Sequence, residues 1–564
     1  MLLLAAFMCT HSYAQAHPGP PVDGYGECET SNMASTYIPI ESWIYPAIER
    51  LALAGYVQTA FAGLRPWTRM ESARLVAEAQ EQQADLDPEE GVDEQMNLLI
   101  RDLAREFAVE LRQRDGQCNR QATIDSIDFR SSAIAGTPIT DGYHSAQTLT
   151  NDYGRPYGEG SNLYTGISGR AALGSFASYL RVEFQRTAPG PTTPSSADAA
   201  IAAADFTPTA AAGPTSGFAR GRVLEGYVSY TFRNNQFSFG KQALWWGPSK
   251  GGPLLFSNNA EPITMGRYDR VSPFELSGVG RWLGPIRMQF FLGRLSGQQF
   301  VHVGSQTLGQ SGVSLSDQPF INGQKFSFKP TPSLEFSVSR TAIFAGAGAP
   351  FTTKSFLRSL FSTGNSTGKT DPGDRRVGVD VQYTIPKMHD LLKIYVDTFT
   401  DDELFPLAYP THSAWSPGFY VARLPHLPHV DFRAEGYLTP RRTGFPGFYY
   451  FNVHYLSGYT NQRQLLGSWI GRESNGYQLW TNWWFSPRSS VQLSARHQTA
   501  SDVFLQGGDL RDLSISADLA LSPHWQLNTA VQQERWRFPL FSATTHNDLT
   551  TTIQLSFHPK AGEL

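Results

Sequence analysis

The chain has 564 residues, with 46 Lys and Arg against 50 Asp and Glu and a formal net charge of −4. This balance excludes the strongly basic character of nucleic-acid-binding proteins, so nucleic acid is not an expected partner. Mean hydropathy is −0.31, and no run of about 20 apolar residues predicts a membrane-spanning helix after residue 16. A membrane β-barrel is compatible with these values, because only alternate residues of each strand face lipid.

Residues 1–16 are predicted to be a secretory signal peptide. An apolar stretch, Leu2–Met8, precedes the small residues Ala14 and Ala16, which suit the positions before a cleavage site. Cys9 offers lipoprotein attachment as an alternative, which the bulky side chain of the residue before it disfavours. We therefore expect the mature chain to be exported.

Cleavage of that segment would leave Cys28 and Cys118 as the cysteines of the mature chain. An oxidising compartment favours disulfide formation, so we expect these two cysteines to be bonded to each other. The bond would tie the segment before the first predicted helix to the segment after the last. Two free thiols are the alternative.

Residues 17–120 are predicted to hold a small helical bundle. Between residues 36 and 115, three stretches are predicted to be helical, and the second opens with a capping-box pattern from Thr68 to Glu71. The apolar positions of the first and third stretches are Ile40, Ile44, Ile48 and Leu51, and Met96, Leu99, Leu103, Phe107 and Leu111. Their apolar faces need a cover, either one another or a larger domain.

Residues 121–564 are predicted to form a β-barrel. From about residue 126 the apolar period changes to two, as in Leu180–Gln185 and Val430–Glu435, where apolar and polar residues alternate. A soluble sandwich and a membrane barrel both alternate in this way. The signal peptide, the count of about 16–18 such segments and aromatic clusters such as Trp483–Phe485 favour the barrel, whose aromatic girdles lie at membrane interfaces.

Two low-complexity connections, residues 187–217 and 361–374, interrupt the strand pattern. The first is rich in Ala, Pro, Thr, Ser and Gly, and the second in Ser, Thr, Gly and Asp. Neither has enough apolar area to order itself alone. Because bacterial outer-membrane barrels carry their longer loops outside the cell, both connections are expected to be external.

Three blocks of the sequence resemble a known family. They are Tyr37–Leu51, Phe239–Pro248 with a Trp-Trp-Gly element, and Leu254–Pro262 with a Ser-Asn-Asn-Ala element. Together they resemble the outer-membrane capsule assembly proteins of the Wzi family, and the similarity in order covers nearly the whole mature chain. The resemblance implies a barrel of about 18 strands with a periplasmic helical bundle. It also implies lectin-like binding of capsular polysaccharide or exopolysaccharide at the cell surface.

Four residues in these blocks are candidate polysaccharide ligands: Trp245, Trp246, Asn258 and Asn259. Indole faces stack on the C–H surfaces of sugars, and side-chain amides donate to and accept from sugar hydroxyls. The functional hypothesis is an exposed glycan platform in a loop. The alternative is a structural loop folded into the barrel lumen, with both tryptophans packed.

Arg267 and Arg270 follow these blocks and are further candidate ligands. Capsular polysaccharides are often acidic, and a guanidinium group binds a carboxylate in a fork geometry. The alternative is an internal network of ion pairs between the barrel wall and a loop.

No metal, cofactor or catalytic site is expected. His426 and His429 are spaced three apart but lack an evident third ligand, and metal sites usually need three or more. The nucleophile-elbow, His-Glu-x-x-His and phosphate-loop motifs are absent from the sequence. An enzyme is therefore not predicted.

The sequence thus predicts a polysaccharide-binding barrel of the bacterial outer membrane that serves in capsule or exopolysaccharide assembly. Expected partners are capsular polysaccharide or exopolysaccharide, outer-membrane lipid, and polysaccharide export machinery docked at the helical bundle. A passive diffusion porin with a charged lumen is the alternative, and an outer-membrane hydrolase is a less favoured one.

Overall fold

A computed structural model describes residues 28–559 except 86–93, 210–215, 311–312, 363–372, 386–391, 402–410 and 443. The predicted signal peptide, and most of the predicted low-complexity connection 361–374, lie outside the described residues. Among the residues that are described, no helix is both long and apolar enough to cross a membrane.

Eighteen antiparallel strands among the described residues follow one another around a closed barrel, and β26 pairs with β2 to close it. They are β2 (Arg120–Ala135), β5 (Gly160–Leu173), β6 (Phe176–Arg186), β7 (Ala219–Phe232), β8 (Asn235–Gln242), β10 (Ile263–Arg270), β11 (Ile286–Arg294), β14 (Phe320–Thr331), β15 (Leu334–Phe344), β16 (Asp374–Thr384), β17 (Leu392–Asp401), β18 (Ala414–Val421), β19 (Val430–Leu438), β22 (Ser474–Ser486), β23 (Ser489–Ala500), β24 (Gly508–Ala520), β25 (Trp525–Arg537) and β26 (His546–Phe557). The predicted fold class, an antiparallel barrel of about 18 strands with N-terminal helices, is confirmed.

Alternation along the strands separates an apolar outer face from a polar inner face. In β6, Leu180 and Phe184 are exposed on the outside by 51% and 55%, while Arg181 and Glu183 are buried inside. Other outward residues of the wall follow the same rule, among them Phe239, Leu493, Leu513, Ile515 and Ile553. Apolar side chains on the outer face of a closed barrel suit contact with lipid.

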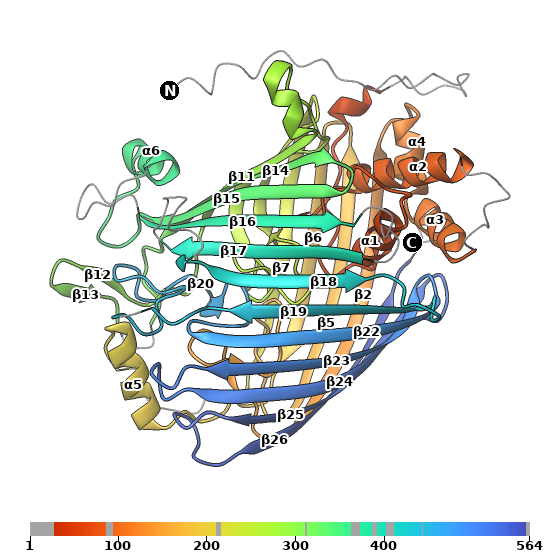
Figure 1. Cartoon of the computed structure of the whole chain (residues 1–564). Coiled ribbons are helices and arrows are strands. Elements are labelled where there is room, and N and C mark those ends of the chain that lie inside the picture. Colours follow the sequence, from red (N-terminus) through yellow and green to blue (C-terminus); the bar gives the residue numbers. More distant parts are fainter. Residues whose placement is uncertain are drawn as a thin grey trace.

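The two ends of the barrel differ in the length of their connections. At one end, which we call the short-turn end, tight turns such as residues 174–175 and 332–333 join neighbouring strands. At the other, the long-loop end, connections such as residues 243–262 and 439–473 are much longer. Figure 1 shows helices α1–α4 at the short-turn end, and α5, α6 and the β12–β13 hairpin at the long-loop end.

The N-terminal helices form a bundle with its own core. They are α1 (Ile44–Leu53), α2 (Arg69–Asp85), α3 (Glu94–Glu106) and α4 (Ala108–Arg114), so the third predicted helix is divided at Phe107. The hydroxyl of Thr68 accepts a hydrogen bond from the Glu71 amide at 3.1 Å, as the capping pattern indicated. The helices cover one another's apolar faces, and a disulfide joins Cys28 to Cys118 across the bundle.

The shorter elements lie in the connections. They are the helix α5 (Ser195–Asp205), the helix α6 (Thr353–Phe361), the 3-10 turns η1 (Thr30–Asn32) and η3 (Gly278–Leu283), and the short strands β1 (Leu64–Arg65), β3 (Thr140–Asp141), β4 (Ala146–Gln147), β9 (Trp245–Trp246), β12 (Val301–Val303), β13 (Gln306–Leu308), β20 (Thr460–Asn461) and β21 (Gln464–Leu465).

Candidate functional site

The long loops fold into the lumen and pack it. Strand β9 of the loop 243–262 pairs with β1 of the N-terminal segment, which sets Trp246 opposite Leu64. The Leu254 amide of the same loop donates to Asp397 on the barrel wall at 2.7 Å, and the hydroxyl of Tyr450, from the loop 439–473, donates to the Leu254 carbonyl at 2.7 Å. Wall and loop residues share one apolar core. These two loops therefore plug the barrel.

The two candidate tryptophans belong to that packed interior. Trp246 is 1% exposed, its indole nitrogen donates to Gln289 at 2.6 Å, and its ring makes edge contacts with Phe256 and Phe291. Trp245 is also buried, in a cluster with apolar residues of the N-terminal segment and the wall. The hypothesis of an exposed indole platform is therefore corrected, because the loop turns inward and the alternative of packed tryptophans describes both side chains.

Asn258 and Asn259 are buried and hold neighbouring loops together. The Tyr153 amide donates to the Asn258 carbonyl at 2.6 Å, and the side-chain amide of Asn259 donates to the Leu465 carbonyl at 3.2 Å. The two residues line different cavities, Asn258 toward the short-turn end and Asn259 toward the long-loop end.

The candidate arginines do not converge on one site. Arg267 lies inside the barrel, where it donates to Asp269 at 2.8 Å and its guanidinium lies over the Tyr37 ring. Arg270 lies on the opposite face of β10 at the short-turn end and donates to the Arg233 carbonyl at 2.7 Å. Residues three apart on a strand point to opposite faces. The alternative of an internal ion-pair network therefore describes Arg267, and the two arginines cannot bind one carboxylate together.

A cavity of about 690 Å³ opens at the long-loop end, and we call it the long-loop cavity. Its volume lies in the range of typical ligand sites. Its wall combines side-chain amides, hydroxyls and aromatic rings from several loops. Among the more accessible lining residues are Gln299, Gln462, Gln464, Tyr157, Phe541 and His546. None of these was predicted, because they come from connections far apart in the sequence and no local pattern marks them.

A second cavity of about 640 Å³, the short-turn cavity, lies on the other side of residues 151–155. It is lined by polar residues of β2 and β24–β26 and by the N-terminal segment. Asp152 and Arg155 line both cavities. Residues 151–155 therefore form a partition between the two.

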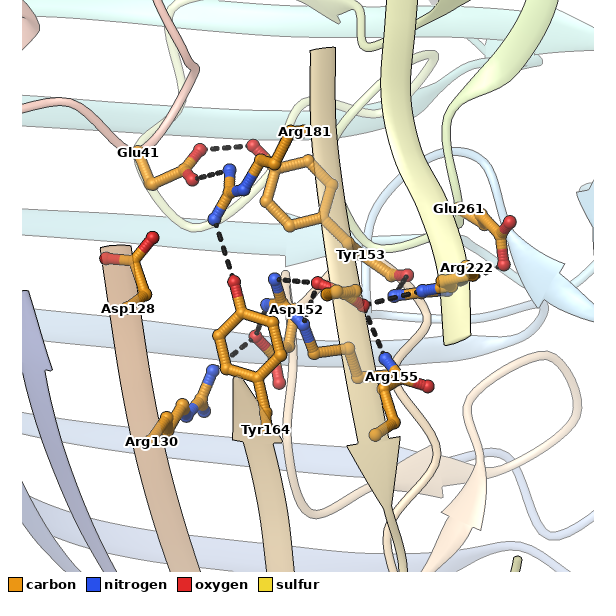
Figure 2. A network of polar contacts seen from close by, with 12 residues as sticks. Glu41, Asp128, Arg130, Asp152, Tyr153, Arg155, Tyr164, Arg181, Arg222 and Glu261 are labelled. Atoms are coloured by element: carbon orange, nitrogen blue, oxygen red, sulfur yellow. Dashed lines mark hydrogen bonds and ion pairs between the residues drawn. The ribbon is translucent and has the colours of Figure 1, made fainter. Parts of the chain in front are cut away.

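Charged side chains anchor this partition to the barrel wall (Figure 2). Asp152 forms ion pairs with Arg130 of β2 at 2.7 Å and with Arg155 at 2.6 Å. Arg155 reaches Glu183 of β6 at 3.0 Å, and Glu183 also contacts Arg222 of β7 at 2.6 Å. The partition is thus held by a continuous network across three strands.

The same network extends to the N-terminal segment and to the β8–β10 loop. Glu41 pairs with Arg181 of β6 and accepts from the Tyr153 hydroxyl. Arg222 also pairs with Glu261 at 2.6 Å. Figure 2 shows these side chains converging around Tyr153. Opening the partition would require several ion pairs to separate together.

Helix α5 covers part of the long-loop cavity, buries Ala197 and Ala202, and carries one carboxylate that makes its charged contacts. Asp205, at its C-terminal end, contacts Nε2 of His144 at 2.7 Å and pairs with Arg472. His144 also contacts Asp141 at 2.9 Å. Burial alone would lower the pKa of His144, but the two carboxylates outweigh it and raise that pKa to about 9. The imidazole is therefore charged at neutral pH.

The apolar outer face, the packed lumen and the cavity above a charged partition define a plugged membrane-type β-barrel. The chain belongs to the family described as capsule assembly protein Wzi, which its sequence matches over residues 130–551. The resemblance noted in the sequence is thereby confirmed. The family description names an assembly protein, in line with the expectation that the chain is not an enzyme.

The known proteins to which the chain is similar include the following two. A protein of Klebsiella pneumoniae, described as "Uncharacterized 55.8 kDa protein in cps region", is 27% identical over 181 residues, which cover 31% of this chain and 32% of that protein. The structure of Wzi from Escherichia coli, described as a carbohydrate-binding β-barrel involved in group 1 capsule assembly, aligns with a TM-score of 0.64 at 15% identity and covers 93% of this chain and 99% of that one. The second comparison shows a shared fold.

Proposed function

We propose that the protein is a lectin-like barrel of the bacterial outer membrane that binds capsular polysaccharide or exopolysaccharide in the long-loop cavity. The observation that carries the proposal is that this cavity has a floor. The partition of residues 151–155 lies beneath it, tied to the wall by ion pairs of Asp152, Arg155 and Glu183. A cavity that opens on one side favours holding a chain segment over conducting a solute.

The orientation follows from the connections. Bacterial outer-membrane barrels have short periplasmic turns and longer extracellular loops. The long-loop cavity then faces the cell surface, and α1–α4 face the periplasm. The description of the Escherichia coli protein as an outer-membrane, carbohydrate-binding barrel involved in capsule assembly supports the membrane location and the class of ligand. The outward apolar belt makes outer-membrane lipid a further partner.

The lining of the long-loop cavity suits neutral parts of a glycan. Side-chain amides such as those of Gln462 and Gln464 donate to and accept from sugar hydroxyls. The rings of Tyr157 and Phe541 offer flat faces for sugar C–H groups. The buried candidates Asn259 and Trp246 lie beneath these lining side chains, where they hold in place the loops to which the lining side chains belong.

The bundle α1–α4 is the proposed docking element for polysaccharide export machinery. It lies at the short-turn end, and its apolar core is already covered within the bundle. A partner would therefore contact its polar outer surface. Cross-linking from exposed α3 residues such as Glu94 tests this docking.

Gene deletion followed by staining of surface polysaccharide tests the assembly role. We expect deleted cells to lose surface-attached polysaccharide and the wild-type gene to restore it. A double variant, Gln464→Ala with Phe541→Ala, should restore it poorly, whereas Gln306→Ala on the exposed β13 strand should restore it fully. Normal polysaccharide on deleted cells would overturn the assembly role, and full restoration by the double variant would move binding away from the long-loop cavity.

Conductance in planar bilayers tests the porin alternative. The packed lumen and the partition lead us to expect no large, stable channel from the purified barrel. A wide open channel with wild-type protein would favour the diffusion porin instead.

A further inference from the structure

The outer face of β14 and β15 carries polar side chains near the long-loop end. Asn322 and Gln324 of β14 lie on the face opposite Lys325, whose ammonium group pairs with Asp380 in the lumen. Arg340 of β15 likewise lies opposite the inward Thr341. Polar side chains on a lipid-facing wall are costly when bare, so a cover over these three would lower that cost.

Helix α6 is that cover. The side-chain amide of Asn322 donates to the Ser359 hydroxyl at 2.7 Å, and that of Gln324 donates to the Leu360 carbonyl at 3.3 Å. Arg340 donates to the carbonyls of Ser359 and Ser362 at 2.5 and 2.9 Å. The last carbonyls of the helix are thus satisfied by a wall cation, which also complements the helix dipole.

The other end of α6 is fixed as well. Thr352 and Ser355 form a reciprocal capping box, with the Ser355 amide donating to the Thr352 hydroxyl at 3.0 Å. The ring of Phe356 packs 6.0 Å from that of Phe344, which lies on the same outer face as Arg340. Helix α6 therefore lies against the outside of the barrel, at the long-loop end where Figure 1 shows it.

The free face of α6 is apolar. Leu357 and Phe361 are exposed by 48% and 60%. Phe351, just before the helix, is 46% exposed, although its ring packs 4.7 Å from that of Phe320 on β14. Leu357 and Phe361 are four residues apart and therefore lie on one face of the helix. Below them on β15, Val338 is exposed by 42% on the same outer wall. The apolar surface of α6 continues the lipid-facing surface of the strands.

We propose that α6 is an interfacial helix that binds the lipid of the outer leaflet, with Phe351, Leu357 and Phe361 among the acyl chains. The exposed Lys354 suits the phosphate groups at the lipid surface, since amphipathic helices of this kind combine buried apolar side chains with cations at the head groups. The occupant is lipid and not a second copy of the chain, because three side chains fall far short of the roughly 1,200–2,000 Å² that a stable interface buries. The inference uses the proposed membrane location but not polysaccharide binding.

Spin-label accessibility in lipid nanodiscs tests the proposal on the full mature chain. Labels at Leu357→Cys and Phe361→Cys should collide readily with oxygen and several-fold less with a water-soluble nickel complex, as a label at Ile515→Cys on the outer wall of β24 should. A label at Gln306→Cys on the external hairpin should show the reverse. All four variants should keep the heat-dependent gel mobility of a folded barrel.

Each other pattern overturns the proposal. If labels at residues 357 and 361 are as accessible to nickel as the label at residue 306, α6 lies in water. Low accessibility to both reagents, with dipolar broadening between labels, assigns the face to a second copy. If the Ile515 label is also accessible to nickel, the membrane location itself fails, which separates that outcome from an error about α6.

Discussion

The helices at the two ends of the barrel are attached by different physical means. At the short-turn end, α1–α4 share a buried apolar core that includes Ile48, Leu51, Leu99 and Leu103. At the long-loop end, α5 is composed largely of alanine and buries only the small side chains of Ala197 and Ala202 beside Asp205, which contacts two charged side chains. Apolar burial is non-directional and insensitive to protonation, whereas a buried ion pair depends on the charge of both partners.

This difference suits the two proposed roles. A bundle that faces export machinery needs a fixed shape, and its core and disulfide provide one. A helix that covers a polysaccharide cavity must allow entry, and a few charged contacts can be separated and remade. The bundle and α5 should therefore respond separately to substitution and to pH.

The largest expected effect comes from the disulfide. Replacing Cys28→Ser and Cys118→Ser opens a loop with a sequence separation of 90. The chain-entropy relation then predicts a loss of about 4–5 kcal/mol from the unfolding free energy of the bundle. Trypsin digestion across a urea series measures it. Reductant should lower the unfolding free energy of the wild-type bundle by the same amount and leave that of the double variant unchanged. A double variant as stable as the wild type would contradict the prediction.

The next effect comes from the charge that docks α1 to the wall. Glu49 pairs with Lys393 and, at 2.7 Å, with Arg433. Burial alone would raise the pKa of Glu49, but these two cations hold it below its ordinary value. Glu49→Ala leaves both cations without this partner and should cost about 3–4 kcal/mol of docking. Faster trypsin cleavage within α1–α4 checks this, and the exposed Glu94→Ala is the control that should leave the rate unchanged.

A smaller and more local effect is expected at α5. Asp205→Ala removes the shared partner of His144 and Arg472. Leaving these buried groups without it should cost about 2–3 kcal/mol, confined to α5. Proteinase K should then cleave between residues 187 and 218 roughly a hundredfold faster, since each 1.4 kcal/mol is about tenfold. Asp198→Ala on the same helix is the control. Equal cleavage rates for the two variants would contradict the assignment of Asp205 as the anchor.

Much of the fold could be predicted from the sequence, because the signals are local. The period-two alternation of Leu180–Gln185 places charged residues inside and apolar ones outside, as β6 has them. Thr68 caps α2, and the bundle lies where helical spacing predicted it. The break at Phe107 could not be predicted, because apolar residues continue at helical spacing through Leu111.

The candidate site was much less predictable. A Trp-Trp pair before Gly-Pro carries no sign of whether its loop turns outward or into the lumen, and pairing with Leu64–Arg65 decides it. The connection 187–217 has too little apolar area to order itself, yet residues 195–205 form a helix because Asp205 binds groups far away in the sequence. Such long-range contacts leave no pattern in the composition of either segment.

The smallest effect is a response of α5 to pH, which should be absent from the bundle. The pKa of His144 is raised to about 9 from an ordinary value of 6.5, so the protonated form is stabilised in the folded chain. The charge on His144 contributes fully to the attachment of α5 below pH 6.5, and this contribution is lost as the pH rises through about 9. Arg472 stays charged over this range and limits the loss. A spin label at Ser196→Cys should gain mobility with a midpoint near pH 9. The same label in a His144→Gln background should show no transition, and a wild-type label that stays immobile to pH 10 would mean that Arg472 alone holds the helix.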